Sequence, residues 1–372
     1  MSSNKKVLIT FLGNIDYDTR CHNLYNTLKV NGFDVSFTGF DWLTQDFNPV
    51  QGKITIHKLQ KRFLSLSFYF KFIWHVKFAL FSSRASIFFA EDIYTLPFVV
   101  IFGKLKRVKI FYDSRELFGY LAGLKKRKFV QSFWKTVEKL FIKHADHIIT
   151  TGSMDSDVLK EMYGVTNTVV LRNVPHFYKP AQQTDLRNQL GISKDKKILL
   201  YQGVILKGRG IEKIFDILPD MSEFVFVLIG GGEFENYYKK LAVERKVIDQ
   251  VFFIGKFSQE DLPKLTPSAD VGIALIDNIS KSYYYALPNK LFEYIMAEVP
   301  VVVSNLPQMK EIVHKFDVGF VVDPDNKNEL ITALKNLTSD EMLYKKFKQN
   351  CKVASEELNW ENEVGDLLEL LK

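Results

Sequence analysis

The stretch LPNKLFEYIMAEVPVVVSN, residues 287–305, decides how this chain folds around its candidate site. Pro288 suits the start of a helix, and Lys290 and Glu293 follow three residues apart, on one face of that helix. The β-branched run 301–303 then predicts a buried strand. Such corners of open α/β sheets bind ligands, and a helix N-terminus favours an anionic group. The stretch therefore favours a nucleotide-type ligand.

The composition is that of a globular protein. Its 372 residues are 47% hydrophobic and 25% charged, and the chain is too long for one ordinary domain, so we expect two of similar size. Cys21 and Cys351 are too few for a disulfide framework or a zinc site, and the polar residues 1–6 lack an apolar signal core. The sequence therefore predicts a cytoplasmic protein.

Positive charge is concentrated in the first half of the chain. Residues 1–180 hold 26 Lys and Arg against 14 Asp and Glu, a net charge of +12, whereas the remainder holds 24 against 29, a net charge of −5. The basic half indicates an anionic neighbour, for which a phosphate-bearing substrate, an anionic membrane surface and nucleic acid are the candidates.

Short apolar runs alternate with helical periodicity in two series, which predicts two Rossmann-like halves. The strands expected in the first series are residues 7–12, 34–40, 87–90, 109–112 and 147–150, with helices notably over 19–31 and 129–145. The strands expected in the second series are residues 198–202, 224–229, 251–254, 271–276, 301–304 and 320–322. Residues 173–180 and the polar run to residue 197 show little apolar periodicity, which indicates an interdomain linker.

Short motifs follow one another along both halves. They are a glycine loop at Gly13, then FYDSRELF (111–118), LRNVP (171–175), YQG (201–203) with RGI (209–211), IGGG (229–232), FIG (253–255) and the stretch 287–305. In this order and spacing they resemble glycosyltransferase family 4, whose members use nucleotide sugars. The resemblance covers nearly the whole chain and implies an α/β fold of the GT-B class, with two facing Rossmann-like domains and an interdomain cleft.

The resemblance also implies how the chain is divided. It predicts an acceptor-binding domain over residues 1–178, a linker over 179–196 and a nucleotide-sugar-binding domain over 197–356. A final helix over 357–372 is expected to cross back to the first domain, with Trp360 as its anchor.

The second domain would bind the donor. In the family, a basic residue after its first strand and the start of the motif helix hold the diphosphate. Arg209 suits this role because a guanidinium meets phosphate with two parallel hydrogen bonds, and Lys207 is the alternative. The resemblance places Glu293 on the ribose hydroxyls and Lys290 near phosphate. Uridine and guanosine both remain open as the base.

Two positions depart from the family pattern. Tyr285 stands where the family has a further glutamate that meets the sugar, and Val204 stands where it has an arginine. The aromatic residues 283–285 offer ring faces and phenol groups to the sugar instead. The other predicted donor-binding residues are glycines and neighbours of the motifs, and with Tyr285 they are Gly13, Gly203, Gly231, Lys256, Leu287 and Asn289.

The first domain would bind the acceptor. Asp18 or Thr19 is expected to cap the helix that follows the glycine loop. Polar residues near strand ends are the candidates for contact with the acceptor, namely Asn14, Arg20, Arg115 and Glu116. The predicted catalytic residues are Arg209 and Lys290 with two strand-end carboxylates, Asp92 and Asp113. Related enzymes commonly have histidine in place of Arg115.

The resemblance implies transfer with retention of anomeric configuration. A retaining glycosidase needs two carboxylates that flank the bond, and no such pair is evident in the sequence. The family instead uses a front-face displacement, in which the departing diphosphate helps to deprotonate the acceptor hydroxyl and the protein supplies positioning and charge. No aspartate-rich metal motif stands out, so we expect neither a metal nor a cofactor. The acceptor would be a glycan or a lipid-linked molecule in cell-surface polysaccharide or glycolipid synthesis.

Residues 63–81 are densely aromatic, but Lys71, His75 and Lys77 interrupt them, so no uncharged run is long enough to span a membrane. With the basic residues around them and the cluster 125–128, residues 61–84 suit an interfacial helix on anionic lipid, at the inner face of the cell membrane. A core helix with an apolar stripe explains the same pattern, and the sequence leaves both interpretations open.

Two other functions remain open. Nucleotide-sugar 2-epimerases share this fold and cleave the same bond, and they would need acid/base carboxylates such as Asp92, Asp113 and Glu116 without an acceptor. A non-catalytic membrane or nucleic-acid module is also consistent with the basic half, although its basic residues follow no nucleic-acid motif.

Overall fold

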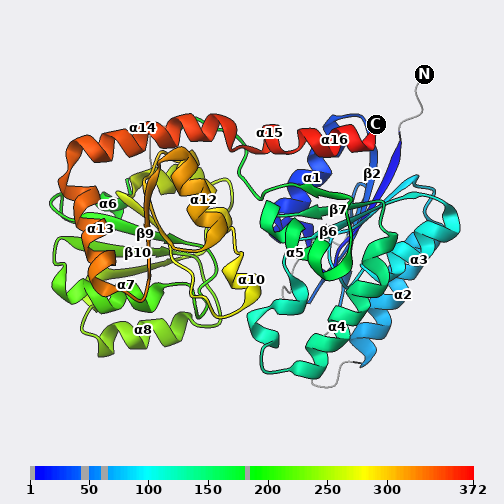
Figure 1. Cartoon of the computed structure of the whole chain (residues 1–372), viewed down its shortest axis with the longest axis horizontal. Coiled ribbons are helices and arrows are strands. Elements are labelled where there is room, and N and C mark those ends of the chain that lie inside the picture. Colours follow the sequence, from blue (N-terminus) through cyan, green and yellow to red (C-terminus); the bar gives the residue numbers. More distant parts are fainter. Residues whose placement is uncertain (1–4, 43–49, 60–65, 181–184) are drawn as a thin grey trace. The chain divides into compact units, whose positions relative to one another are not determined.

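The computed structural model describes residues 5–42, 50–59, 66–180 and 185–372, and the chain divides into two compact units (Figure 1). Unit 1 comprises Met1–Arg172 with Asp366–Lys372, and unit 2 comprises Asn173–Gly365. The division falls before the predicted boundary at residue 178, and the described part of the predicted linker 179–196 belongs to unit 2. Of the predicted final segment 357–372, residues 366–372 belong to unit 1.

Unit 1 is built on an eight-stranded sheet in the order β3-β4-β2-β1-β5-β6-β7-β8. Only the short edge strand β3 is antiparallel to its neighbour, and the central strands are buried, as parallel sheets covered by helices require. The strands are β1 (Lys6–Thr10), β2 (Asp34–Asp41), β3 (Val50–Gln51), β4 (Ile54–Lys58), β5 (Ile87–Ala90), β6 (Lys109–Ser114), β7 (His147–Thr150) and β8 (Thr168–Val170).

The helices of unit 1 are α1 (Thr19–Val30), α2 (Leu66–Ser82), α3 (Leu96–Lys106), α4 (Lys128–Phe141), α5 (Ser153–Tyr163) and the C-terminal α16 (Gly365–Leu371). Short 3-10 helices cover Ile15–Tyr17, Phe118–Tyr120, Ala122–Leu124 and Ile142–His144. Asp18 caps α1, as the sequence predicts, because its carboxylate accepts the Cys21 amide at 2.8 Å. Lys5 and Lys109 hold α16 by donating to the carbonyls of Leu371 (2.9 Å) and Leu370 (2.6 Å).

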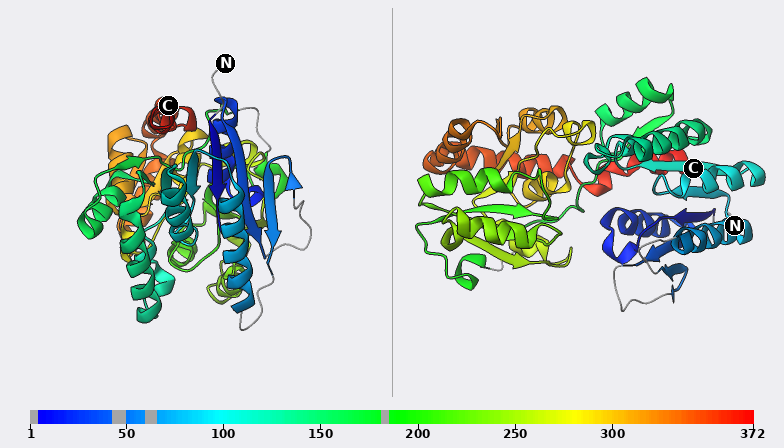
Figure 2. Two further views of the ribbon diagram at one scale, coloured as in Figure 1. Left: turned by 90° about the vertical axis from the view of Figure 1, so that its right-hand side faces the viewer. Right: turned by 90° about the horizontal axis from the view of Figure 1, so that it is seen from below.

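Unit 2 is built on a six-stranded parallel sheet in the order β11-β10-β9-β12-β13-β14, with helices on both faces (Figure 2). The strands are β9 (Lys197–Gln202), β10 (Phe224–Ile229), β11 (Val251–Gly255), β12 (Val271–Ala274), β13 (Val301–Ser304) and β14 (Gly319–Val322). The helices are α6 (Leu186–Gln189), α7 (Ile211–Ile217), α8 (Glu235–Glu244), α9 (Leu262–Leu265), α10 (Lys281–Tyr284), α11 (Asn289–Met296), α12 (Pro307–Phe316), α13 (Lys327–Ser339), α14 (Glu341–Glu357) and α15 (Trp360–Glu363). Short 3-10 helices cover Leu218–Asp220, Ile248–Gln250 and Thr266–Ser268.

Both sheets reverse their strand order at their first strand. In unit 1, β1 lies between β2 and β5, and in unit 2, β9 lies between β10 and β12. This doubly wound order confirms the predicted α/β class with two Rossmann-like domains. Ligands of such sheets bind at the carboxyl ends of the strands beside the reversal, so we expect ligands at the loops after β1, β5, β9 and β12.

The described part of α2 bears out the core helix that the sequence left open for residues 61–84, and the interfacial interpretation stays a prediction. Phe68, Phe72, Val76 and Leu80 form a buried stripe, so α2 does pack into unit 1. Its opposite face is also apolar and is exposed. Residues 61–65 lie outside the described residues. Over the described parts of the chain, every helix is too short or too polar to cross a bilayer.

Two histidines join α2 to the sheet. The rings of His57 on β4 and His75 on α2 stack with their centroids 3.9 Å apart, and Phe40 lies beside both. Burial, with help from His75, lowers the pKa of His57 to about 4, and burial and then Lys71 lower the pKa of His75. Because the folded chain favours two neutral rings, the pair stabilises unit 1 only where both are uncharged.

We expect this contact to weaken in acid. The folded-state pKa values lie below the usual 6.5, so the stabilisation is complete above pH 6.5 and is lost as pH falls towards about 4. His57→Phe removes one of the two titrating rings, and the wild type should lose about 1–2 kcal/mol relative to it over this range, less than the full shift in pKa implies because the rings are partly exposed. Hydrogen exchange of the β4 and α2 amides measures the difference. His22→Phe, on an exposed position, is the control. If hydrogen exchange of these amides depends on pH in the same way in wild type and His57→Phe, the histidine pair does not make unit 1 less stable in acid.

Candidate active site

The loop after β9 is shaped by glycines. Gly203, Gly208 and Gly210 all have positive φ angles, of 127°, 74° and 74°. Gly230, at the end of β10, passes so close to this loop that a Cβ there would lie 1.9 Å from the Gly203 carbonyl oxygen. The glycines therefore allow the ends of β9 and β10 to approach each other closely, which leaves backbone groups at the carboxyl edge of the sheet.

The opening stretch folds into α11 followed by β13, and Pro288 occupies the N-cap position of α11. Lys290 is buried, and its ammonium lies 3.4 Å from the centroid of the Tyr201 ring at the end of β9. Glu293 accepts a hydrogen bond from Gln202 Nε2 at 2.5 Å. Gln202 is held in turn by the Thr266 hydroxyl, which donates to its Oε1 at 2.8 Å. The start of α11 and the end of β9 thus meet through two charged side chains.

Arg209 and Lys207 take different directions from the glycine loop. The Arg209 guanidinium lies 4.7 Å from the centroid of the Tyr283 ring, and its charge acts on Lys290. The Lys207 ammonium lies over the rings of Tyr237 (4.8 Å) and Phe234 (5.3 Å), at the start of α8. Of the two predicted phosphate ligands, Arg209 is the one whose charge reaches the α11 site.

The α11 site is short of negative charge. Burial, reinforced by Arg209 and opposed by Glu293, holds the pKa of Lys290 well below its usual range. Burial also raises the pKa of Glu293, although Gln202 and Lys290 oppose the rise. Burial thus disfavours the charged forms of both Lys290 and Glu293, and Arg209 adds a positive charge beside them. This arrangement favours an incoming anion, because an anion would restore the charged form of Lys290.

The other predicted donor residues lie around this centre. Gly231 follows β10, and a Cβ there would lie 2.9 Å from Lys256 Cε, so the two predicted residues are neighbours. The carbonyl of Tyr285 accepts a hydrogen bond from Gln308, and its ring meets that of Tyr284 with centroids 4.9 Å apart. Leu287 is partly buried and Asn289 is exposed where α11 begins. Their roles in donor binding stay predictions.

Sequence reasoning missed several partners in the α11 site. Gln202 lies in the YQG motif but is not among the predicted site residues, and Thr266 lies in none of the motifs. Tyr283 is predicted to contact the sugar, but its contact with Arg209 is not predicted. Tyr178 also belongs to this group, since burial and then Glu293 raise the pKa of its phenol. Only their position in the fold identifies them, because nothing in their own sequence context distinguishes them from other polar residues.

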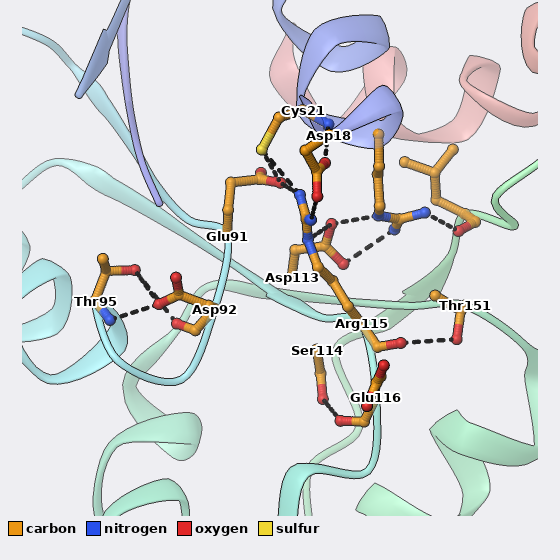
Figure 3. A network of polar contacts seen from close by, with 12 residues as sticks. Asp18, Cys21, Glu91, Asp92, Thr95, Asp113, Ser114, Arg115, Glu116 and Thr151 are labelled. Atoms are coloured by element: carbon orange, nitrogen blue, oxygen red, sulfur yellow. Dashed lines mark hydrogen bonds and ion pairs between the residues drawn. The ribbon is translucent and has the colours of Figure 1, made fainter. Parts of the chain in front are cut away.

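In unit 1 the corresponding strand ends carry a buried network centred on Arg115 (Figure 3). Its guanidinium contacts Asp18 Oδ2 at 2.7 Å, Glu91 Oε2 at 2.6 Å and the Cys21 sulfur at 2.9 Å, and it lies 4.6 Å from the centroid of the Phe11 ring. These groups come from the loop after β1, the start of α1 and the ends of β5 and β6. Arg115 therefore ties together the elements that surround the strand-order reversal of unit 1.

Glu91 is the deepest member of this network. Its side chain is fully buried, and burial raises its pKa to about 7, with Arg115 opposing the rise and Asp113 adding to it. Burial alone would raise the pKa of Asp18 as well, but Arg115 and the Cys21 amide outweigh it and hold that pKa below its usual value. Within the described residues, Glu91 Oε1 and Arg115 Nε have no hydrogen-bond partner. Glu91 is an acidic strand end beside Asp92 in the sequence, but neither it nor Cys21 is among the predicted site residues, because the network forms only in the folded unit.

Arg20 and Asp113 form a second, two-pronged ion pair. Arg20 Nε and Nη2 contact the two carboxylate oxygens of Asp113 at 2.5 and 3.0 Å, and both side chains are at most 3% exposed. Arg20 Nη1 also donates to the Leu171 carbonyl at 2.8 Å. These contacts tie α1 to the end of β6, so both residues have a structural role beside the acceptor and catalytic roles predicted for them.

The remaining predicted residues of unit 1 are held by short-range contacts. Asp92 accepts from the Leu12 amide (2.5 Å), the Thr95 amide (2.7 Å) and the Thr95 hydroxyl (3.0 Å), and burial raises its pKa. Asn14 donates to Asp41 at 2.8 Å. The Gly13 carbonyl accepts the Phe40 amide, and Glu116 is exposed. Their catalytic and binding roles are not tested by these contacts.

Residues 182–353 match the protein-family model described as Glycosyl transferases group 1. These residues are a glycosyltransferase domain. The match contains the α11 site, and it confirms the enzyme class that the sequence predicts for this part of the chain. Over the described residues, no group of three His, Cys, Asp or Glu side chains is arranged to hold a metal ion.

Relatives of the chain are also glycosyltransferases by name. It is 26% identical over 195 residues to an uncharacterized glycosyltransferase of Methanocaldococcus jannaschii. The matched residues make up 51% of this chain and 48% of the relative. This chain therefore spans about half the length of that relative. An uncharacterized glycosyltransferase of Haemophilus influenzae is 23% identical over 353 residues, with 92% of each chain covered.

Solved structures show the GT-B fold of the chain. Sucrose-phosphate synthase from Thermosynechococcus elongatus matches with a TM-score of 0.81 at 17% identity, over 99% of this chain and 98% of the other. Anabaena HepE, in complex with UDP and glucose, matches with a TM-score of 0.75 at 15% identity, over 99% of both chains. The residues that match the family model thus form part of a chain with the GT-B fold.

We expect Asp113→Asn to destabilise unit 1. The change leaves the Arg20 guanidinium buried without its counter-charge, which should lower the free energy of unfolding by about 3–5 kcal/mol. Denaturant unfolding measures the loss. Glu341→Gln, which removes an exposed pair with Lys345 on α14, should leave the free energy of unfolding close to that of the wild type. Wild-type stability in Asp113→Asn would mean that the pair does not hold α1 to β6.

Proposed function

We propose that the chain is a retaining glycosyltransferase of family 4 that moves a sugar from a nucleotide diphosphate sugar to an acceptor hydroxyl. UDP and GDP sugars are the proposed donors. The acceptor would be a glycan or a lipid-linked molecule in cell-surface polysaccharide or glycolipid synthesis. The contact with an anionic membrane that the sequence predicts for residues 61–84 is part of this proposal.

The observation that carries the proposal is the charge arrangement of the α11 site. Arg209 and Lys290 supply two cations beside a glycine loop, and a diphosphate supplies the negative charge that they favour. Glu293, held by Gln202, is a carboxylate that can accept hydrogen bonds from two vicinal hydroxyls of a ribose. A nucleoside diphosphate matches both features at once.

Named relatives support this class of donor and acceptor. Anabaena HepE has been solved in complex with UDP-glucose, and the chain matches that structure with a TM-score of 0.74. An alpha-galactosylglucosyldiacylglycerol synthase of Streptococcus pneumoniae is 21% identical over 247 residues. A putative colanic acid biosynthesis glycosyl transferase of Escherichia coli is 22% identical over 226 residues. Uridine donors and glycolipid or polysaccharide products therefore occur by name among proteins similar to this one.

The proposed reaction needs positioning and charge more than a protein nucleophile. The bond between the anomeric carbon and the diphosphate oxygen breaks, and the acceptor oxygen bonds to that carbon on the same face. The acceptor proton passes to the departing diphosphate. Arg209 and Lys290 would stabilise the negative charge that develops on the diphosphate, and we propose that they do so without a metal ion. The phenols of residues 283–285 are the proposed contacts of the sugar, because Tyr285 replaces the family glutamate.

A nucleotide-sugar epimerase is the second candidate, since Glu91 is a buried carboxyl with a pKa near neutrality, as acid/base catalysis requires. The two functions differ in their products. An epimerase converts its donor in the absence of an acceptor, whereas a transferase given a donor alone releases nucleotide diphosphate slowly by hydrolysis.

Incubation of the full chain with UDP and GDP sugars should release free nucleotide diphosphate slowly. Glu293→Ala should weaken nucleotide binding by about ten- to a hundredfold, because a hydrogen bond to a charged group contributes roughly 1.5–3 kcal/mol. Calorimetric titration with UDP and GDP measures the affinity, and Glu341→Ala on exposed α14 is the matched control. Unchanged binding in Glu293→Ala would show that the nucleotide does not occupy the α11 site. An epimerised donor would instead support the second candidate.

Nucleotide binding should take up protons through Lys290. Because burial lowers its pKa in the free protein, a bound diphosphate should raise that pKa, and affinity should increase as pH falls through the range between the pKa of the bound and of the free protein. Titration calorimetry in two buffers of different ionisation enthalpy measures the uptake.

Lys290→Met should abolish this uptake and weaken binding. Lys207→Met, which removes an ammonium that lies against aromatic rings, should keep the uptake. Equal proton uptake in wild type and Lys290→Met would place the diphosphate elsewhere.

A further inference from the structure

Helices α2, α3 and α4 are neighbours in unit 1 (Figures 1 and 2), and each turns large apolar side chains towards solvent. On α2 these side chains recur at helical spacing opposite the buried stripe, and each is between 62% and 86% exposed: Leu66, Phe70, Trp74, Phe78 and Phe81. Exposed side chains of this size are normally scattered singly on a monomer, so a whole helix face of them indicates a binding surface.

The two neighbouring helices repeat this pattern. On α3, Ile101 and Leu105 lie one turn apart and are 45% and 74% exposed. On α4, Phe129, Phe133 and Leu140 share one face and are 94%, 59% and 61% exposed. We call these ten residues of α2, α3 and α4 the three-helix face. Ten exposed apolar side chains on adjacent helices are more than one amphipathic segment at residues 61–84 supplies.

The exposed charges of the same helices are all positive. They are Lys71 and Lys77 on α2, Lys104 on α3, and Lys128 and Lys139 on α4, whereas Lys106 and Lys135 are half-buried. Glu138, the single acidic residue in these three sequences, is 1% exposed and accepts hydrogen bonds from Tyr112 and Tyr163 at 2.8 Å each. Lys104 pairs with Asp146, beyond α4, at 3.6 Å. The loop before α4 adds the cluster 125–127, so the surface combines apolar side chains with a net positive charge.

Aromatic packing beneath the surface holds the three helices together. Phe72 of α2 meets Phe98 of α3 with ring centroids 6.3 Å apart. Trp134 of α4 meets Tyr94 and Phe118 at 4.8 and 5.5 Å. The outward side chains are therefore carried on helices that are already packed against one another. Little conformational entropy of these helices is lost when the side chains contact a binding partner.

We propose that the three-helix face docks on an anionic lipid bilayer. This inference rests on the membrane contact in the proposed function and extends it from residues 61–84 to α3 and α4. Aromatic and aliphatic side chains would enter the interfacial region, while the lysines meet the lipid phosphates. A second copy of the chain fits less well, because a two-fold contact through this face would bring the same positive charges together.

The test uses the full chain and vesicles of phosphatidylcholine, with and without phosphatidylglycerol, in a sedimentation assay. The α2 variant carries Phe70→Ser, Trp74→Ser and Phe78→Ser, and the α4 variant carries Phe129→Ser, Phe133→Ser and Leu140→Ser. The matched control changes three exposed apolar residues of unit 2, namely Val243→Ser, Met342→Ser and Val353→Ser. Wild type and control should prefer the anionic vesicles, and each test variant should bind them at least about tenfold more weakly.

A charge variant keeps the test decisive if a serine variant fails to fold. Lys71→Gln, Lys128→Gln and Lys139→Gln together should remove much of the preference for anionic vesicles and leave the apolar side chains in place. Added salt should weaken wild-type binding in the same way.

Several results would overturn the inference. Wild-type binding by the α4 variant would restrict docking to α2, and equal binding to neutral vesicles would exclude recognition of anionic lipid. A lipid-free dimer that the α2 and α4 variants convert to monomer would identify the face as a contact between copies. UDP and GDP binding, measured on the same variants, should be unchanged because the α11 site lies in unit 2. Vesicle binding without nucleotide binding would therefore reject the proposed donor and leave the docking face standing.

Discussion

The hydroxyl of Tyr294 is the contact on which the arrangement of the α11 site depends. It accepts the Gln202 amide at 2.9 Å, and the carbonyls of Leu200 and Ile273 lie 2.9 and 3.3 Å away as its acceptors. One buried group of α11 thus joins β9 to β12, where the strand order of unit 2 reverses. Gly272 makes room for it, since a Cβ there would lie 2.4 Å from the Tyr294 ring. With α11 held in this register, its neighbours Lys290 and Glu293 have little freedom over where they meet the end of β9.

The basic side chains of the two units have different partners, and this difference separates structural support from ligand binding. In unit 1, Arg20 and Arg115 form ion pairs with carboxylates of the same unit. These ion pairs hold α1, β5 and β6 together. In unit 2, the contacts of Lys290 and Arg209 are with the rings of Tyr201 and Tyr283. An aromatic face stabilises a cation less than a carboxylate does and leaves its charge available to an anion. The geometry therefore favours unit 2 as the place where an anionic ligand is held.

The sequence predicts the framework better than the contacts within it. The bounds predicted for β5, β7, β10 and β13 agree with the structure, because each is a short apolar run flanked by turns. The prediction missed β4 and β8. In β4 apolar residues alternate with polar ones and the strand ends in His57 and Lys58, and β8 has only three residues. Lys290 and Glu293 could be chosen from the sequence because they share one helix. Their partners could not be chosen, because Gln202 and Glu293 are 91 residues apart and Arg20 and Asp113 are 93 apart. Hydrogen bonding across such separations depends on strand order, which a single sequence leaves undetermined.

Helix α2 shows how one sequence pattern can support two interpretations. A stripe of Phe68 and Phe72 and a stripe of Phe70 and Trp74 both recur every four residues, so composition alone cannot say which stripe faces the core. The structure assigns the first stripe to the core and leaves the second exposed. Lysines keep such a helix from spanning a bilayer, and the buried stripe fixes it to the sheet of unit 1. A helix with both properties suits the proposed lipid contact, and the exposed faces of α3 and α4 beside it would enlarge the area of that contact.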